Sequence, residues 1–438
     1  MKRLTAIAAL LALSVGAASA QELKSAYFLE GYVYGYHLNP AAPIDGKPFT
    51  FFGTTISHVA ANVQTNIGLN SVFFPLDGAL VSGFDERIPA EKFIDPLPDI
   101  SRMIVGANVN LLTFGRQGEK SRFAFEVNVR TDNYAEIPKG FFSMMKTGLT
   151  EGIQSKTGSY TFNDLYFNSG SRAEIALSYA RKIGDKFTVG ATLKGLIGLH
   201  YAAVGFNSMT LSKGADKDLA ASLDGYLKVA TPMIGLNTIS YGGKKYFDNT
   251  SNPLTTHPFG ISGFGFAGDL GVTFEPVDGL TLSLSALDLG FMSWNANIVG
   301  RMNYDSRELD IKEYEQLAWI EALDAEKLNT SLNYTIHAGA KYKMPFYDRL
   351  SVGLLGTMQK YYKEMRLGVN VNPVNPLSLT ASFAYGSFGA DFGGALNVRF
   401  PGVNLYVGMD SFIFEFTPQY VPIQRVNTTV NMGLVIAI

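Results

Sequence analysis

The stretch SRFAFEVNVR, from Ser121 to Arg130, alternates between apolar and polar side chains. Every second position is apolar, and these positions are Phe123, Phe125, Val127 and Val129. Successive side chains of a β-strand point to opposite faces, so the pattern predicts a strand with one apolar and one polar face. It does not say which face is inside. In a soluble sheet the phenylalanines would point into a core, whereas in a membrane barrel they would face lipid and the charged residues would line the lumen.

The composition favours a membrane barrel over a soluble enzyme. Of 438 residues, 47% are hydrophobic and 17% are charged, whereas a soluble domain has about 25% charged residues. The net charge of −2 provides no basic surface for a nucleic acid. The chain has no cysteine, which excludes disulfides, thiolate metal sites, cysteine nucleophiles and a lipid anchor on an N-terminal cysteine.

Residues 1–20 are predicted to be a secretory signal peptide. Lys2 and Arg3 are basic, residues 4–15 are uncharged and rich in leucine and alanine, and Ala18-Ser19-Ala20 is a small-residue cleavage site. An N-terminal membrane anchor is the alternative. No later apolar run reaches the roughly 18 residues that a transmembrane helix needs. We therefore expect an exported protein that does not cross a membrane with helices.

The alternation of the first stretch recurs along the chain, at residues 62–70, 172–181, 186–194, 334–343, 391–400 and 430–438. Many of these segments are followed by short turns of glycine, proline, asparagine and aspartate, which adopt the backbone angles of tight turns. Long connections lie near 71–101, 132–170, 206–264 and 300–331. Placing the tight turns at the periplasmic end and the long connections at the outer end gives about 14 strands, provided that residues 223–229 belong to a loop.

These features predict an all-β protein, a transmembrane antiparallel β-barrel of about 14 strands with an N-terminal plug. The expected domains are the plug at residues 21–48 and the barrel at residues 49–438, with the long connections as outer loops. Several strands approach the roughly 9–11 residues that a tilted transmembrane strand needs. A secreted soluble β protein is the alternative fold. In the barrel, Phe123 and its apolar neighbours would face lipid.

Three stretches carry a resemblance to a known family: SYARKIGDKFTVGATLKGLIG at 178–198, LSLSALDLGFMSWN at 282–295 and SAYFLEGYVYGYHLNPA at 25–41. They resemble an uncharacterised outer-membrane β-barrel family of Bacteroidota, a domain-of-unknown-function family. In architecture, that family is similar to the long-chain fatty-acid transporter barrels and to the related barrel of the type IX secretion system. The resemblance implies a plugged barrel that is integral to the outer membrane of a Gram-negative bacterium. It implies this fold more firmly than a function.

The resemblance also points to residues in the plug. In the fatty-acid transporter barrels an Asn-Pro-Ala motif lies near the end of the plug, and Asn39, Pro40 and Ala41 match it here. The same segment is aromatic, with Tyr32, Tyr34 and Tyr36 among its side chains. An aromatic segment suits both the sealing of a lumen and contact with an apolar ligand. The alternative is a plug that never moves.

Charged and polar side chains on the inner face of the predicted strands should line the lumen. These residues are Arg122, Glu126, Arg130, Arg172, Glu174, Lys194, His337, Lys341 and Arg399. Pairing of the strands at 121–130 and 172–181 would bring several of them together. Opposite charges in a closed lumen form a hydrogen-bonded network that stabilises a barrel. The alternative interpretation is a path for a polar or amphipathic solute.

A short apolar patch is expected in the long connection near 132–170, and its members are Phe141, Phe142, Met144 and Met145. Helical spacing would place three of these side chains on one side. We expect the patch to cover the outer mouth of the barrel, where an exposed apolar surface could contact lipid or a partner protein.

No catalytic or metal-binding constellation is evident in the sequence. The five histidines are scattered, and none pairs with another at a metal-ligand spacing. The GxGxxG pattern at residues 263–268 is followed by an expected strand, whereas a dinucleotide-binding loop is followed by a helix. The sequence therefore predicts a protein that is not an enzyme and that has no metal or cofactor.

The leading functional hypothesis is a transporter or channel for a hydrophobic or amphipathic small molecule, such as a fatty acid, surrounded by outer-membrane lipid. The second is a platform that docks secretion-system or surface-assembly proteins on its outer loops. The third is an open diffusion porin. None of these hypotheses involves a nucleic acid.

Overall fold

Antiparallel strands account for most of the computed structural model, which describes residues 22–44, 48–55, 57–148, 159–213, 219–248, 254–258, 260–309, 320–412, 416, 418 and 425–438. The predicted signal peptide lies outside these residues. Residues 310–319, in the last of the long connections, do so too.

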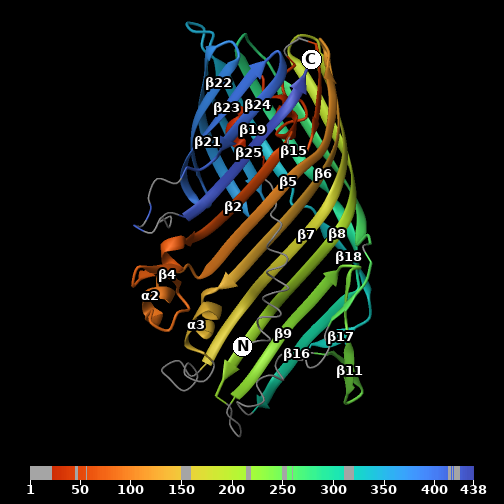
Figure 1. Cartoon of the computed structure of the whole chain (residues 1–438), viewed down its shortest axis with the longest axis vertical. Helices are drawn as coiled ribbons and strands as arrows, with labels where there is room; N and C mark the ends of the chain where they lie inside the picture. The colour runs from red at the N-terminus through yellow and green to blue at the C-terminus, as the bar shows by residue number, and fades with distance from the viewer. Residues whose placement is uncertain are drawn as a thin grey trace.

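Within the described residues, 14 antiparallel strands close into a barrel (Figure 1). The first strand is interrupted and consists of β1 (Phe49–Thr54) and β2 (Val59–Gly68). The others follow in pairing order as β5 (Ile100–Gln117), β6 (Ser121–Pro138), β7 (Ser159–Ile183), β8 (Phe187–Ser212), β14 (Gly263–Phe274), β15 (Leu280–Ala296), β18 (Glu326–Ser331) with β19 (Thr335–Lys343), β20 (Leu350–Gln359), β21 (Tyr362–Val374), β22 (Leu377–Gly386), β23 (Gly389–Phe400), β24 (Gly402–Met409) and β25 (Arg425–Ala437). The last strand, β25, pairs with both halves of the first, and this closes the ring.

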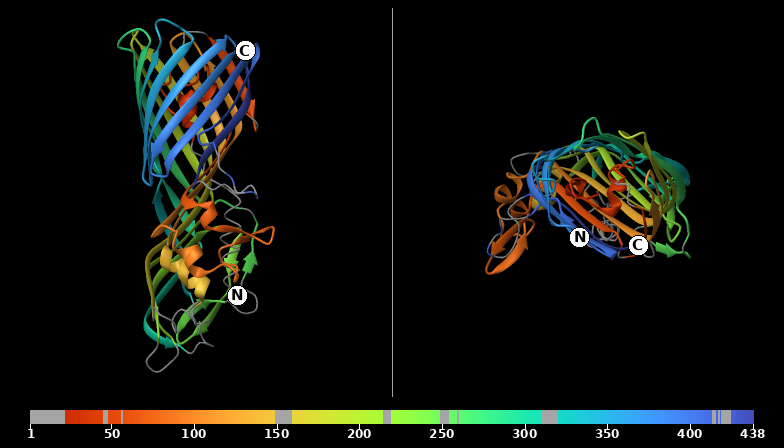
Figure 2. Two further views of the ribbon diagram at one scale, coloured as in Figure 1. Left: turned by 90° about the vertical axis from the view of Figure 1, so that its left-hand side faces the viewer. Right: turned by 90° about the horizontal axis from the view of Figure 1, so that it is seen from above.

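One side of the barrel continues past the ring as a curved sheet. β7 and β8 have 25 and 26 residues, more than twice the 10 residues of β20 and of β22 on the other side. Beyond the ring, β8 pairs with β9 (Leu219–Ala230). The sheet continues from β9 in pairing order with β16 (Ile298–Leu309), β17 (Glu321–Leu323), β12 (Lys244–Phe247) and β11 (Thr238–Tyr241). Figure 2 shows this extension at the end opposite to the C-terminus. The outer rim is therefore much taller on one side than on the other.

Smaller elements fill the outer connections and the barrel interior. Two further two-stranded sheets lie outside the main sheet. One is the hairpin of β3 (Phe73–Leu76) and β4 (Ala79–Ser82), and the other pairs β10 (Ile234–Leu236) with β13 (Leu254–Thr256). The described helices are η1 (Lys24–Tyr27), η2 (Val33–His37), η3 (Leu69–Ser71), α2 (Ala90–Ile94) and α3 (Lys139–Thr147).

Each helix in the described part of the chain is too short or too polar to cross a membrane.

The two faces of the wall differ in polarity, which answers the question raised by residues 121–130. Arg122, Glu126 and Asn128 point inward and are at most 6% exposed. Outward apolar side chains on the neighbouring strands are open to the surroundings: Leu177 of β7 is 48% exposed and Leu193 of β8 is 66% exposed. The predicted antiparallel barrel of about 14 strands is confirmed. Its apolar face is the outer one.

The long connections contain more strand than the sequence pattern indicated. β6 runs to Pro138 and β7 begins at Ser159, so much of the predicted loop near 132–170 is strand. Residues 223–229 lie in β9, a strand of the extension and not of the closed ring. These strand segments stand beyond the ring, where the outward face need not be apolar. The alternation that marks a membrane strand is therefore weak there.

The closure of the ring can be tested by cross-linking, because the chain has no cysteine of its own. Ala61 of β2 and Val430 of β25 are directly opposite. Opposite residues of antiparallel strands have Cβ atoms about 4.5–5.5 Å apart. This is close to the Cβ–Cβ distance in a disulfide, which is about 3.5–4.5 Å. The variant Ala61→Cys with Val430→Cys should therefore form an intramolecular disulfide on mild oxidation, seen as a mobility change on a denaturing gel that reductant reverses. Ala61→Cys with Leu434→Cys, out of register by four residues, is the control. Equal cross-linking of both variants would contradict this closure.

Candidate functional site

The N-terminal segment at residues 22–44, called the plug segment below, lies inside the barrel (Figure 2). Its aromatic side chains are buried; Phe28, Tyr34 and Tyr36 are each at most 2% exposed. Phe28 packs against Gly353 of β20 and Gly368 of β21, which lie opposite each other on these adjacent strands. A Cβ atom on Gly368 would lie 2.2 Å from the Phe28 ring. Glycine at this position therefore leaves the space that the plug segment fills.

The Asn-Pro-Ala motif is held against another part of the wall, at β14. The Asn39 side chain accepts a hydrogen bond from the Ala41 amide at 2.8 Å and donates one to the Val272 carbonyl at 3.3 Å. A Cβ atom on Gly271 of β14 would lie 2.0 Å from the Asn39 side-chain oxygen. Arg122 donates to the carbonyls of Pro40 at 2.8 Å and of Ala42 at 3.2 Å. The motif is thus a turn that is fixed by backbone hydrogen bonds.

A buried ion cluster fastens the start of the plug segment. Arg366 of β21 is 1% exposed and donates to Glu364 at 2.8 Å. Its guanidinium lies 3.6 Å from Asp410, near the end of the chain. Asp410 accepts hydrogen bonds from the backbone amides of Lys24 and Ser25, each at 2.8 Å. The carboxylate thereby satisfies amides at the start of η1 that have no partner within the helix.

A second ion cluster lies in the wall around Asp288. Lys194 of β8 lies 2.6 Å from Asp288 and 2.9 Å from Asp269, and Arg130 of β6 lies 2.8 Å from Asp288. Asp288 has a φ of +57°, where the register of β14 and β15 shifts. Its backbone amide donates to Asp269 at 2.7 Å. The bulge in β15 therefore places the Asp288 carboxylate between Arg130 of β6 and Lys194 of β8.

A third cluster joins the plug segment to the interruption between β1 and β2. His37 of η2 lies 2.9 Å from Glu126 of β6, and its other ring nitrogen lies 3.4 Å from Glu22. His58, in the interruption, lies 3.1 Å from the same Glu22 oxygen. Burial by itself lowers the pKa of His37, but Glu126 and Glu22 raise it to about 10. Burial by itself raises the pKa of Glu22, but His58 and His37 hold it well below its usual value.

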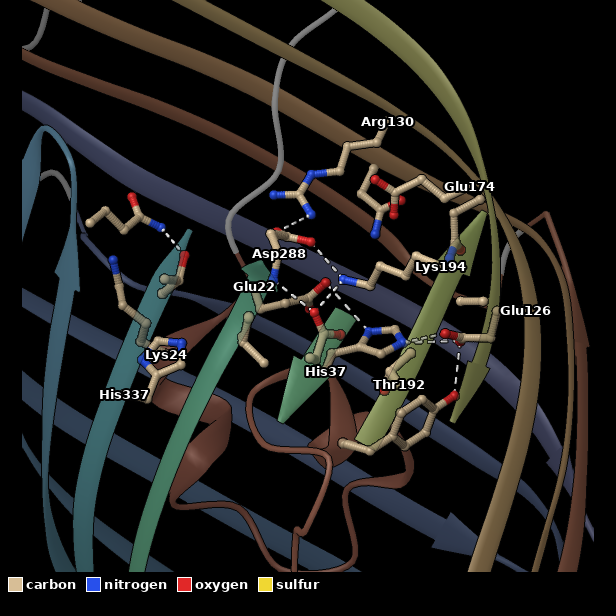
Figure 3. Close-up of a pocket in the computed structure, with 18 of the residues that line it drawn as sticks. Glu22, Lys24, His37, Glu126, Arg130, Glu174, Thr192, Lys194, Asp288 and His337 are labelled. Atoms are coloured by element: carbon tan, nitrogen blue, oxygen red, sulfur yellow. Dashed lines mark hydrogen bonds and ion pairs between the residues drawn. The ribbon is translucent and has the colours of Figure 1, made fainter. Parts of the chain in front are cut away.

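A cavity of about 70 Å³ lies between these clusters (Figure 3). Its walls are mostly polar or charged and include Glu22, His37, Glu126, Lys194, Asp288 and His337. Such a volume holds a few water molecules, each of which needs about 10–15 Å³ on this measure. The cavity is too small for an organic solute as it stands.

An aromatic cluster closes the lumen above this cavity, on the outer side. We call it the aromatic bridge; it consists of Ile104, Tyr134, Tyr166, Tyr361, Tyr362 and Phe388. The rings of Tyr134 and Tyr361 stack with centroids 3.8 Å apart and planes 12° apart. Tyr134 is on β6 and Tyr361 is in the turn before β21, and six strands separate β6 from β21 in either direction around the ring. The stack therefore spans the lumen.

The order of these layers can be followed along β6. Arg122, next to the tight turn, contacts the plug segment. Glu126 and Asn128, further along, line the cavity. Tyr134, near the outer end, belongs to the aromatic bridge. A single strand thus passes the plug segment, the polar cavity and the outer seal in turn.

A family model described as "Family of unknown function (DUF5723)" matches residues 40–410. The chain belongs to this family. No curated protein sequence matches the DUF5723 chain.

Solved structures similar to the DUF5723 chain include three bacterial barrels. One is a FadL homologue of Pseudomonas aeruginosa, with 11% identity, a TM-score of 0.44, and coverage of 96% of this chain and 98% of that one. The Ralstonia pickettii toluene transporter TbuX has 11% identity, a TM-score of 0.42, and coverage of 97% and 95%. The Pseudomonas putida toluene transporter TodX has 11% identity, a TM-score of 0.40, and coverage of 96% and 95%.

The nine residues expected to line the lumen of the DUF5723 barrel fall into separate groups. Arg122 and Glu126 contact the plug segment, while Arg130 and Lys194 bind Asp288. The remaining five are Arg172, Glu174, His337, Lys341 and Arg399. Arg172 pairs with Glu174 at 2.7 Å and also with Asp132. His337 lies 3.0 Å from Thr357, and Lys341 and Arg399 are half-buried. The pairing of β6 with β7 sets Asn128 opposite Glu174 and Arg130 opposite Arg172. Most of the charges therefore have a partner in the wall.

The four residues of the expected outer-mouth patch do not form one surface, which corrects that expectation. They lie in α3, where Phe142 packs against Phe93 of α2 and Phe141 packs against Phe162 of β7. Met144 packs on a small cluster of buried side chains. Met145 is 41% exposed. α3 thus bridges β7 and the loop helix α2, because its apolar residues divide between these two neighbours.

Sequence reasoning missed the residues that hold the plug segment. Tyr362, Glu364 and Arg366 alternate with outward apolar residues along β21, and this pattern could have identified them. Asp410 gave no signal, because its partners lie about 385 residues earlier. The rings of His37 and His58 meet in the fold, with centroids 4.8 Å apart. Their spacing in the sequence contains no hint of it.

Arg366→Met tests whether the buried ion cluster holds the plug segment. The substitution leaves Glu364 and Asp410 without their buried guanidinium, and breaking a buried pair from one side costs about 3–5 kcal/mol. Amide hydrogen exchange at residues 24–38 should rise by roughly 100-fold or more, since about 1.4 kcal/mol is a factor of ten, while exchange in β6 and β7 stays slow.

Arg349→Met is the matched control, because Arg349 is exposed and bonds a turn carbonyl. Unchanged exchange at residues 24–38 in Arg366→Met would show that this cluster does not hold the segment.

Proposed function

We propose that the protein is an integral outer-membrane transporter for an amphipathic small molecule. The outward side chains of the barrel strands are apolar and open to the surroundings. β20 and β22 have 10 residues each, which matches the roughly 9–11 residues of a tilted membrane strand. The proposal includes export by a signal peptide at residues 1–20 and an origin in Bacteroidota, which the resemblance implies. It assigns no catalytic activity.

The observation that carries the proposal is the small polar cavity between two layers of side chains that cross the lumen. The aromatic bridge lies on its outer side and the plug segment on the other. An open diffusion porin needs a continuous water-filled lumen, and this lumen is interrupted at two levels. A path with two seals and a chamber between them suits a transporter that opens one seal at a time.

The chemistry of the layers favours an amphipathic solute. Tyrosine rings of the aromatic bridge offer apolar faces with polar edges. Below them, the cavity offers carboxylates, cations and amides, with Lys194, Asp288 and His337 among its lining. An apolar chain with a polar head group, such as a fatty acid, could contact both layers in sequence. A purely apolar solute would displace the water of the cavity and give its polar walls no hydrogen bond in return.

A docking platform is the second candidate, and one observation favours it. The β3–β4 hairpin and the segment after it expose Phe73, Leu80 and Phe84, which are 37%, 42% and 43% exposed. Figure 2 shows this hairpin projecting away from the barrel. Apolar side chains at such a place suit contact with a secretion-system or surface protein, or with the surrounding lipid.

Mass spectrometry on the protein purified gently from outer membranes distinguishes the two candidates. An organic extract should contain one discrete amphiphile, at close to one molecule per chain and absent from an unrelated barrel purified in the same way. Uptake of that amphiphile into proteoliposomes should then require the protein. An extract containing only bulk membrane lipid would argue against transport and favour the platform.

Removal of the aromatic bridge should open the outer seal. In Tyr134→Ala with Tyr361→Ala, the stacked rings that span the lumen are gone. A cysteine is introduced by Thr192→Cys, since Thr192 lines the cavity. We expect this thiol to react at least 10-fold faster with a small water-soluble thiol reagent when the bridge is removed.

Tyr385→Ala is the control, because Tyr385 is 68% exposed on the outer face. Equal reaction rates in the bridge variant and the control would mean that this stack does not seal the lumen. Retention of heat-modifiable mobility on a gel shows that each variant still folds.

A further inference from the structure

Three potential metal ligands from separate parts of the chain meet in the lumen. They are the carboxylate of Glu22, at the start of the plug segment, Nδ1 of His37 in η2, and Nε2 of His58 in the interruption of the first strand. All three atoms lie within 4.8 Å of one another. Two of the separations are 3.4 Å and 3.1 Å. Ligands of tetrahedral zinc lie about 3.3 Å apart, given bonds of about 2.0–2.1 Å.

Hydrogen bonds elsewhere on the rings fix which nitrogen of each histidine faces Glu22. Nε2 of His37 lies 2.9 Å from the Glu126 carboxylate. A carboxylate only accepts, so this nitrogen carries a proton. The hydroxyl of Tyr406 contacts Nδ1 of His58 and lies 3.3 Å from the Ser57 carbonyl. With its proton on Nδ1, His58 presents Nε2 to Glu22 as an electron-pair donor.

The two remaining ring nitrogens point at the same carboxylate oxygen. Nδ1 of His37 makes no hydrogen bond of normal geometry in the described part of the chain, although it is buried. Nε2 of His58 lies 3.1 Å from Oε1 of Glu22. Three potential ligand atoms thus converge on one point. A single cation between them would contact all three.

We propose that Glu22, His37 and His58 bind one zinc ion. Two imidazoles and a carboxylate form a ligand set that zinc accepts, with a fourth position left for water. Glu22 and His37 line the cavity, which can supply that water. The groups behind the ligands match those found around zinc sites: Glu126 on His37, Tyr406 on His58, and Asn431, which donates to the second oxygen of Glu22 at 3.1 Å. Figure 3 shows Glu22 and His37 pointing toward each other from the plug segment.

The charges in the lumen are compatible with a divalent cation. Glu22 and Glu126 supply two negative charges next to the three ligand atoms. The nearest clusters pair their charges within themselves: Arg366 and Lys24 with Glu364 and Asp410, and Lys194 and Arg130 with Asp288 and Asp269. The Tyr34 ring covers both histidines, with centroids 5.1 Å and 5.0 Å away. Zinc would bind here in a shielded, locally neutral environment.

Such an ion would fasten the plug segment to the wall. Two of its ligands belong to the plug segment and the third belongs to the interruption between β1 and β2, where Ser57 and Asn110 hold the chain by a hydrogen bond of 2.7 Å. Loss of the ion would free both parts together. The site does not depend on which solute the barrel carries.

Cobalt titration tests the site directly. The protein is purified without a polyhistidine tag, stripped with EDTA and titrated with Co²⁺, which reports a site of low coordination number by visible absorption. We expect saturation at one Co²⁺ per chain and displacement by Zn²⁺. His37→Gln and His58→Gln should each weaken binding by at least 100-fold. Tyr406→Phe keeps the ring and removes the hydroxyl, and should weaken binding by roughly 10-fold.

His257→Gln is the matched control, because His257 is exposed and outside the cluster; its binding should equal that of the unaltered protein. Thermal unfolding of every variant in EDTA shows whether its barrel is intact. The proposal is overturned if the unaltered protein shows no saturable visible band. It is equally overturned if intact His37→Gln and His58→Gln variants bind as tightly as the His257→Gln control, since the metal would then bind elsewhere.

Discussion

The constraint on which the rest of this structure depends is that a barrel with an apolar outer face has only one place for its polar side chains. Alternation along each strand sends every second residue into the lumen, so the charges of all the strands are collected in one narrow space. A charge without water or a partner is costly there. The plug segment, the ion clusters and the small cavity are the means by which those charges are satisfied. Glycines at the inner face, such as Gly271 and Gly368, let the plug segment approach the wall closely enough to take part.

The same constraint explains why the plug segment is held by its backbone as much as by its side chains. Asp410 binds amides of Lys24 and Ser25, and Arg122 binds carbonyls of Pro40 and Ala42. A segment with little regular structure has many unsatisfied backbone groups, and inside a lumen it must find partners for them. The polar wall provides those partners. The tyrosines fill the remaining space and contact one another and His58.

Much of the fold could be predicted from the sequence, because the alternation at residues 121–130 is a local property of one strand. That Arg122 and Glu126 share one face of their strand follows from it. The number of strands was inferred from the turns and the long connections, with residues 223–229 assigned to a loop, although they form part of β9. The candidate site could not be predicted to the same extent. Its contacts join residues such as Glu22 and His58, or Ser25 and Asp410, which meet only after the ring has closed. The length of β7 and β8 was also hidden, since the part beyond the ring is not held to a membrane pattern. The local sequence pattern predicts the strands of the barrel wall. The contacts between residues far apart in the sequence are set by the topology of the closed barrel.

The position of Asp410 has a consequence for the order in which the chain folds. The plug segment is made first, but the carboxylate that caps η1 belongs to the last part of the chain, 386 residues after Lys24. The ring itself closes only when β25 pairs with β1 and β2. Contacts of such long sequence separation form late, because the loop they close is costly in entropy. The start of the plug segment can therefore take its final place only once the part of the chain around Asp410 is in position.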